Sequence, residues 1–276
     1  MLKQRVITAL VLLAVLLAAF ALGRTAFDLL AAALIGAAAF EWLRLAGLAD
    51  RLAAALAMVY AALLLILELS GRTPSGPVIT LIVAGACAVW ATLFVTLLQA
   101  ELGGVRVGRT VSIALCFALL TAAWFALLYL YGRGIVALLS VLAVVWLADV
   151  SAYFAGRAFG KRKLAPSISP GKTWAGVYGA VLGVVAVAAL AHWAWPSAPL
   201  FTNQLFATLN VALVVALLCM LVAVSIVGDL FESLMKRQAG LKDSGGLLPG
   251  HGGVLDRIDA LLPVLPAAVL IQRWLT

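Results

Sequence analysis

The sequence predicts an all-α, polytopic integral membrane protein, and three observations support this class. Hydrophobic residues make up 66% of the 276 residues and charged residues only 11%, whereas soluble domains carry about 25% charged residues. Apolar stretches recur along the whole chain, many of them near the length of about 20 residues that a membrane helix needs. Glycine, proline and charged residues separate them. We therefore expect one membrane domain over residues 1–276.

Nine apolar windows define the expected spans. Their approximate bounds are 6–22, 25–43, 52–69, 77–98, 111–131, 135–155, 175–195, 204–228 and 258–275. The first window imitates a secretion signal, but its apolar run is long and another follows almost at once, so we interpret it as a spanning helix. Residues 1–131 carry only membrane character. Residues 132–276 hold the candidate chemistry, in two expected loops, 156–174 and 229–257.

The distribution of basic residues orients these spans. With a cytoplasmic N-terminus, fifteen of the nineteen Lys and Arg residues fall on the inner side, as the positive-inside rule predicts. This topology, together with anionic lipid headgroups, accounts for most of the net charge of +8, so we expect no nucleic-acid partner. The two loops hold nine of the fifteen inner basic residues, which would suit an anionic substrate.

The acidic residues gather in the C-terminal part. Five of the eleven lie between Asp229 and Asp259, and Asp149 lies near the inner end of the sixth span. Carboxylates at the membrane boundary are costly unless they are paired or hold cations. For Glu41 and Glu68, which lie near other span ends, we expect snorkelling or interhelical pairing rather than catalysis.

A polar stripe is predicted where the eighth span leaves the membrane. The spacing i, i+3, i+4, i+7 puts four residues on one helix face, and these are Asp229, Glu232, Ser233 and Lys236. An ordinary amphipathic surface helix would show the same pattern, so both interpretations stay open. The glycine-rich segment 242–253 follows, and its backbone N–H groups can wrap phosphate oxygens.

Asp256 and Asp259 are i, i+3 neighbours in the first turn of the last span. Helix N-termini favour negative charge, so capping explains one of them but not the pair together with Asp229. Two carboxylate clusters beside a phosphate-compatible loop suit Mg²⁺, which takes one or two carboxylates, water and phosphates. The residues alone therefore favour phosphoryl or nucleotidyl transfer. A polytopic transporter is the alternative, although it would place its charges near the midplane.

Residues 233–259 read SLMKRQAGLKDSGGLLPGHGGVLDRID and resemble the phosphatidate cytidylyltransferase, or CDP-diacylglycerol synthase, family. The family pattern is S-x-x-K-R, four residues, K-D, and later P-x-H-G-G-x-x-D-R-x-D, and all its fixed positions are met. A second stretch, from Asp149 to Trp174, is also similar to the family. Ala175 departs from it, because many relatives carry Glu or Gln there, and no role is assigned to this position.

The resemblance implies a homodimeric membrane enzyme that transfers CMP from CTP to phosphatidic acid. It implies Mg²⁺ at the active site and leaves a second cation open. It also implies a bacterial inner membrane as the location, with the site facing the cytoplasm. A CTP-dependent transferase acting on another lipid phosphate is the related alternative. No residue specifies the acyl chains or separates CTP from dCTP.

The candidate site residues follow from these patterns and from the resemblance. Metal ligands are expected at Asp229, Asp256 and Asp259. Catalytic roles are expected for Asp229, Asp256, Lys242 and His251, with loop shaping as the alternative for His251. Substrate and phosphate contacts are expected at Ser169, Lys172, Thr173, Lys236, Arg237, Asp243, Gly252, Gly253 and Arg257. Further candidates are Asp149, Tyr153, Arg157, Glu232 and Ser233, with an ion pair to Arg157 or a neighbour as the alternative for Asp149.

Overall fold

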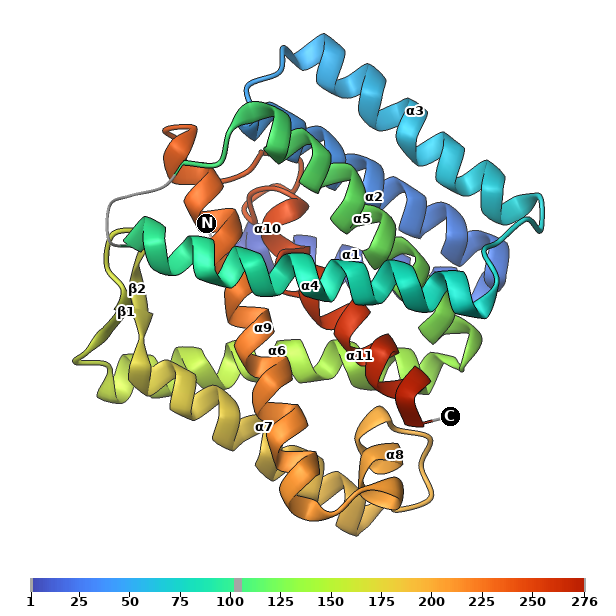
Figure 1. Cartoon of the computed structure of the whole chain (residues 1–276), viewed down its shortest axis with the longest axis vertical. Coiled ribbons are helices and arrows are strands. Elements are labelled where there is room, and N and C mark those ends of the chain that lie inside the picture. The colour runs from blue at the N-terminus through green and yellow to red at the C-terminus, as the bar shows by residue number, and fades with distance from the viewer. Residues whose placement is uncertain (1, 102–105, 276) are drawn as a thin grey trace.

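The structure, a computed structural model, describes residues 2–101 and 106–275, and in the first helix it describes side chains at positions 4, 7 and 8 and from 10 onward. Almost all of the described chain is helical or turn (Figure 1). The elements are α1 (Leu2–Leu22), α2 (Arg24–Leu45), α3 (Asp50–Leu69), α4 (Gly76–Glu101), α5 (Arg109–Gly132), α6 (Ile135–Phe159), β1 (Lys163–Ala165), β2 (Ser169–Thr173), α7 (Trp174–Ala194), α8 (Phe201–Thr208), α9 (Val211–Gln238), α10 (Leu255–Ile258) and α11 (Leu261–Leu275).

Eight helical segments in the described ranges are long and apolar enough to cross a membrane. They are α2, α3, α4, α5, α6, α7, α9 and the combined segment Leu255–Leu275. The first expected span, 6–22, falls within α1, whose described apolar part, Leu10–Leu22, is shorter than a span. The prediction of an all-α, polytopic membrane protein is confirmed. The ninth span and the cytoplasmic N-terminus stay predictions.

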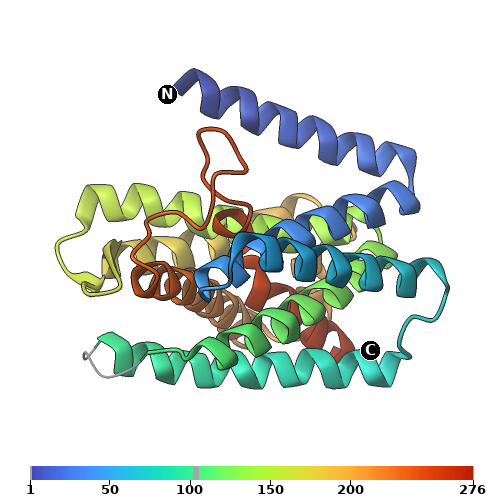
Figure 2. The same cartoon turned by 90° about the horizontal axis from the view of Figure 1, so that it is seen from above.

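Helix α11 lies at the centre of the bundle. It packs against α4, α5, α6 and α9, and its residues Val264, Ala268 and Val269 are fully buried. Figure 2 shows α1 on one side of the molecule and α4 on the opposite side, with α11 between them. Because the polar residues of 255–259 immediately precede this buried helix, the packing of α11 fixes where they lie.

An ion-pair network joins α2 and α3. Arg24 Nε lies 2.9 Å from Asp28 Oδ1, and Arg24 Nη2 lies 2.6 Å from Glu68 Oε1. The guanidinium also lies over the ring of Tyr131, 5.2 Å from its centroid. The interhelical pairing predicted for Glu68 is therefore confirmed. For Glu41 the snorkelling alternative is wrong, as shown below, whereas its hydrogen bond from Leu255 N does connect α2 with α10.

The predicted span 204–228 is wrong at its start. The short helix α8 ends at Thr208, and α9 begins anew at Val211. Asn210 is the reason, because its side-chain oxygen accepts a hydrogen bond from Leu213 N at 2.9 Å and so caps the new helix. Asn203 holds the preceding turn by donating to the carbonyl oxygens of Trp195 and Ala198.

The two predicted loops are shorter and more ordered than expected. Helix α6 continues to Phe159, and the rest of 156–174 contains an antiparallel hairpin of β1 and β2, in which Ala165 lies opposite Ser169. Helix α9 continues to Gln238, so the second loop is reduced to 239–254. The polar stripe from Asp229 to Lys236 therefore lies on a helix, as its spacing predicted.

Helices α6 and α7 pack closely through small residues, as membrane helices often do. A Cβ on Gly179 would overlap the Cβ of Ala155 and lie 3.0 Å from the carbonyl oxygen of Ser151. Backbone and a methyl group cannot turn away, so we expect Gly179→Ala to lower the free energy of unfolding by about 1–3 kcal/mol. Thermal unfolding in detergent measures this. Gly85→Ala is the control, because a Cβ there meets nothing within 4 Å. Equal stability of the two variants would contradict the prediction.

Candidate active site

A cavity of about 500 Å³ lies between α6, the β-hairpin, α7 and α9, and we call it the cleft. Six of the predicted site residues line it, together with small residues of α6 and α7. These six are Asp149, Tyr153, Arg157, Lys172, Thr173 and Asp229. The two stretches that the sequence analysis singled out separately therefore meet at one site.

Lys172 and Asp229 form an ion pair across the cleft. Lys172 Nζ, on β2, lies 2.5 Å from Asp229 Oδ2, on α9, and both side chains are partly exposed. Ser233, one turn further along α9, places its Oγ 3.4 Å from Asp229 Oδ1. The pair is open to the cavity, so an incoming anion could exchange for the carboxylate at Lys172.

The turn of the hairpin that carries Lys172 is held from two helices. Its turn is fixed to α4, because Ser167 donates from its N–H and its Oγ to the Glu101 carboxylate at 3.1 and 2.7 Å. Arg237 Nε, on α9, lies 3.4 Å from the carbonyl oxygen of Ile168. The predicted contact residue Arg237 thus supports the hairpin from outside the cleft, whereas Ser169 begins β2 and is partly buried.

Thr173 joins the hairpin to α7. It is the N-cap of α7, and its Oγ1 accepts a hydrogen bond from Gly176 N at 3.1 Å. A Cβ on Gly156 would lie 3.1 Å from this Oγ1, so that glycine lets the cap approach α6. The Thr173 hydroxyl is therefore engaged locally, and its predicted phosphate contact stays a prediction.

Three candidates lie on α6 at intervals of four residues, which places them along one helix face. Arg157 Nη1 donates to the hydroxyl of Tyr153 at 3.2 Å. Asp149 forms no ion pair with Arg157 in the described structure. The charge of Asp149 instead interacts with those of Asp229, Lys172 and Arg257. Its place on the cleft wall supports the site interpretation over the alternative ion pair with Arg157.

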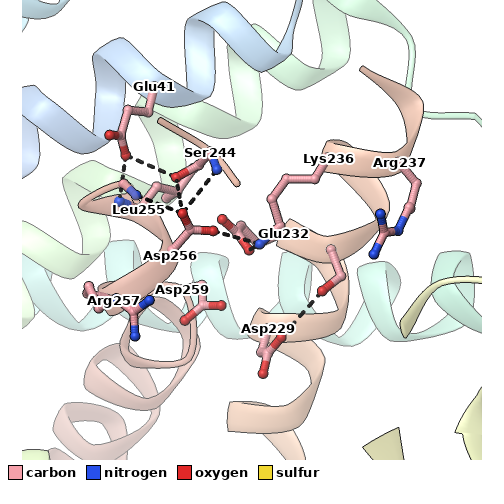
Figure 3. Close-up of polar contacts among 12 residues, drawn as sticks. Glu41, Asp229, Glu232, Lys236, Arg237, Ser244, Leu255, Asp256, Arg257 and Asp259 are labelled. Atoms are coloured by element: carbon pink, nitrogen blue, oxygen red, sulfur yellow. Dashed lines mark hydrogen bonds and ion pairs between the residues drawn. The ribbon is translucent and has the colours of Figure 1, made fainter. Parts of the chain in front are cut away.

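A second group, which we call the lysine cluster, consists of Glu232, Lys236 and Asp256 (Figure 3). Lys236 Nζ lies 2.6 Å from Asp256 Oδ1 and forms a close ion pair with Glu232. The side chains of Glu232 and Asp256 are only 4% and 8% exposed, so the Lys236 ammonium group lies between two buried carboxyl groups. The cluster joins α9 to α10.

Asp256 also organises the glycine-rich loop. Its Oδ2 accepts hydrogen bonds from Ser244 N at 3.0 Å, Ser244 Oγ at 3.0 Å and Gly253 N at 2.8 Å. A Cβ on Gly252, whose φ is +84°, would lie 2.8 Å from the same oxygen. Both carboxylate oxygens are therefore occupied in this structure, by Lys236 and by the loop. The start of α10 has no side-chain cap hydrogen bond in the described structure, so the capping interpretation is not borne out. The metal role predicted for Asp256 stays a prediction.

Asp259 lies between the cleft and the lysine cluster. Its Oδ1 accepts a hydrogen bond from Ala260 N at 2.7 Å, and its charge interacts with those of Asp229, Lys172 and Lys236. In the part of the chain that the structure describes, no three His, Cys, Asp or Glu side chains converge as a metal-ligand set. Mg²⁺ commonly uses only one or two protein carboxylates, so Asp229 and Asp259 suffice in chemistry and number.

Other predicted residues lie outside these two groups. Lys242 and Asp243 are exposed on the glycine-rich loop. Arg257 donates from Nε and Nη2 to the carbonyl oxygen of His251, at 3.1 and 2.5 Å. The structure does not bring Lys242 or His251 into the cleft, so their predicted catalytic roles have no support from its geometry.

Glu41, on α2, is the residue that sequence reasoning missed. It is fully buried and contacts the glycine-rich loop (Figure 3). Its Oε2 accepts hydrogen bonds from Leu255 N at 2.8 Å and Ser244 Oγ at 3.1 Å. The expected snorkelling is wrong, because the loop folds over the end of α2 and shields the carboxylate. A carboxylate within a membrane helix is a functional candidate by default, and that signal was present in the sequence.

Comparisons with known proteins point to one family. A family model described as the cytidylyltransferase family matches residues 3–275. The chain is 42% identical over 289 residues to a phosphatidate cytidylyltransferase of Pseudomonas aeruginosa, with 99% of each chain covered. It is 47% identical over 135 residues to a protein of the same name from Haemophilus influenzae, covering 49% of this chain and 44% of that relative. For Staphylococcus epidermidis the identity is 39% over 157 residues, covering 54% and 56%.

The fold, the charged cleft and these comparisons together define a multi-pass membrane enzyme of the nucleotidyltransferase class. The transporter alternative is thereby set aside. More specifically, the chain belongs to the cytidylyltransferase family, and the resemblance to phosphatidate cytidylyltransferases expected from residues 233–259 is confirmed.

Proposed function

We propose that this chain transfers CMP from CTP to phosphatidic acid, giving CDP-diacylglycerol and pyrophosphate. The observation that carries the proposal is the cleft, in which Lys172 pairs with Asp229 and the charges of Asp149 and Asp259 lie close by. Similarity over 99% of the chain to a relative named for this activity supports the choice of substrates.

In this reaction an oxygen of the lipid phosphate attacks the α-phosphorus of CTP. A new P–O bond forms, the bond from the α-phosphorus to the bridging oxygen breaks, and pyrophosphate leaves with the electron pair. The lipid phosphate is already anionic, so no strong general base is needed. The barrier comes from bringing anions together, and positioning with electrostatic stabilisation should dominate catalysis.

The residues of the cleft suit this task. Lys172 Nζ is close enough to the cavity to exchange Asp229 for a phosphate oxygen. Arg157, which donates to the Tyr153 hydroxyl, lines the same cavity and supplies a second cation. Lys236 is enclosed by Glu232 and Asp256, so we assign it to holding α10 in place and not to leaving its partners for a phosphate.

We further propose Mg²⁺ as the cofactor, and leave a second cation open. Asp229 and Asp259 would hold Mg²⁺. Asp229 lines the cleft, where its two oxygens contact Ser233 Oγ and Lys172 Nζ. Asp259 accepts a hydrogen bond from Ala260 N through Oδ1. When bound, Mg²⁺ would neutralise phosphate charge and polarise the reacting phosphoryl group.

The location and assembly are proposals as well. The relatives named above are bacterial, and the excess of basic residues on one side supports a cytoplasmic membrane with the cleft facing the cytoplasm, where CTP is available. The homodimer rests on the family resemblance alone.

The direct test uses the purified protein with CTP labelled at the α- or the γ-phosphate. We expect the α-label to enter the lipid and the γ-label to leave as pyrophosphate, in a reaction that a chelator stops and Mg²⁺ restores. Entry of the γ-label into lipid would show a kinase and overturn the proposal. A polyprenyl phosphate offered beside phosphatidic acid tests the alternative acceptor, and preference for it would overturn the assigned substrate.

A further inference from the structure

Glu41 is a buried carboxylate that the proposed reaction does not use. It lies on α2, in the half of the chain where the sequence shows only membrane character, yet its nearest polar partners belong to residues 244–255. Its Oε1 has no hydrogen-bond partner in the described structure. A buried carboxylate that is only partly satisfied costs stability, and the hydrogen bonds that offset this cost come from the loop that covers it and from the start of α10.

Two glycines of the loop make room for this carboxylate. A Cβ on Gly245 would overlap the Glu41 carboxylate, with Glu41 Cδ 2.7 Å away. A Cβ on Gly253 would lie 2.6 Å from Glu41 Oε1 and would overlap Ser244 Oγ. The neighbouring Gly246 is different, because a Cβ there would meet nothing within 4 Å. Two glycines that suggested phosphate binding are thus explained by contact with α2.

A continuous chain of polar contacts connects Glu41 to the lysine cluster. Ser244 Oγ lies 3.1 Å from Glu41 Oε2 and 3.0 Å from Asp256 Oδ2. Asp256 in turn lies 2.6 Å from Lys236 Nζ through its other oxygen. The Leu255 N–H, at the start of α10, also donates to Glu41. Glu41 therefore contacts both the loop and the helix that carries Asp256 (Figure 3).

We propose that Glu41 is a positioning residue, which seats the glycine-rich loop on α2 and thereby fixes Asp256 and the start of α10 beside the cleft. It acts through Ser244 and the Leu255 N–H and does not touch the substrates. Its effect on turnover rests on the proposed function, whereas its effect on the loop does not.

The test measures amide hydrogen exchange at Ser244, Gly253 and Leu255 in the full-length protein in detergent. Glu41→Ala is expected to speed exchange there by roughly ten- to a hundredfold, the effect of losing a buried hydrogen bond to a charged group. Glu41→Gln keeps an oxygen for Leu255 N–H and should retain most of the protection. Asp28→Asn changes a buried carboxylate on the same helix that pairs with Arg24 and should leave these amides unchanged. Unchanged exchange in folded Glu41→Ala would overturn the proposal.

The glycine contact gives a second, independent test through epistasis. Gly245→Ala should loosen the loop in the wild-type background but have little further effect in Glu41→Ala, because the group it meets is gone. Gly246→Ala should leave loop exchange within about twofold in both backgrounds, as expected for open surface positions. In turnover, Glu41→Ala should lower kcat/KM for CTP, with partial rescue by Glu41→Gln. If Gly245→Ala changed loop exchange equally in both backgrounds, the proposal that Glu41 positions the loop would be contradicted, whatever reaction the protein catalyses.

Discussion

Asp229→Asn is expected to lower the rate of CMP transfer by on the order of a thousandfold, because several kcal/mol of transition-state stabilisation would be lost and each 1.4 kcal/mol is worth a factor of ten. The substitution keeps the shape of the side chain but removes the charge that pairs with Lys172 at 2.5 Å. It also removes one of the two carboxylates proposed to hold Mg²⁺.

The Mg²⁺ dependence of turnover separates these two roles. If Asp229 only anchors Lys172, then Lys172→Met and the double variant Asp229→Asn/Lys172→Met should have the same turnover. The Mg²⁺ concentration for half-maximal rate should then be unchanged in Asp229→Asn. If Asp229 binds the cation, that concentration should rise in Asp229→Asn and stay unchanged in Lys172→Met. Asp50→Asn is the control, because this carboxylate pairs with Arg44 and its side chain is 73% exposed. Near wild-type turnover of Asp229→Asn at limiting Mg²⁺ would exclude the metal role.

Much of the fold follows from hydropathy, because a bilayer admits only chains that satisfy their own backbone hydrogen bonds. The window 175–195 and helix α7, Trp174–Ala194, differ by one residue at each end. Hydropathy does not detect a helix restart between two apolar segments. The break before α9 depends on one side-chain cap, at Asn210, and the window 204–228 passed over it.

The candidate site was predictable where spacing alone fixes geometry. The i, i+3, i+4, i+7 pattern placed Glu232 and Lys236 on one face of α9, and the structure pairs them. Contacts between distant segments were not predictable in the same way. Glu41 and Ser244 lie 203 positions apart, and no local pattern joins them. For Asp256, the sequence predicted its place at the start of the last helical segment. Its four hydrogen bonds were not predictable, because they depend on how the loop folds.

The lysine cluster predicts the largest effect on stability. Lys236→Met would leave Glu232 and Asp256 buried close together with no cation between them. Breaking a buried ion pair by removing one partner typically costs about 3–5 kcal/mol, and here two carboxylates lose the same partner. Thermal or denaturant unfolding in detergent should show this loss, together with weaker protection of α10. Lys242→Met, at an exposed position, should change stability by less than about 0.5 kcal/mol.

A second substitution tests the cause. In Lys236→Met/Glu232→Gln one of the two carboxylates becomes neutral, so the repulsion and much of the desolvation penalty that follow the loss of Lys236 are relieved. We expect the double variant to be more stable than Lys236→Met alone, although Glu232→Gln by itself should destabilise the protein by removing one partner of Lys236. Glu232→Gln would thus destabilise the wild-type protein but stabilise Lys236→Met, and this change of sign is expected only if both carboxyl groups share Lys236. Additive losses would instead mean that Lys236 contributes through packing of its aliphatic chain, and that α10 is held by the Asp256 hydrogen bonds to the loop.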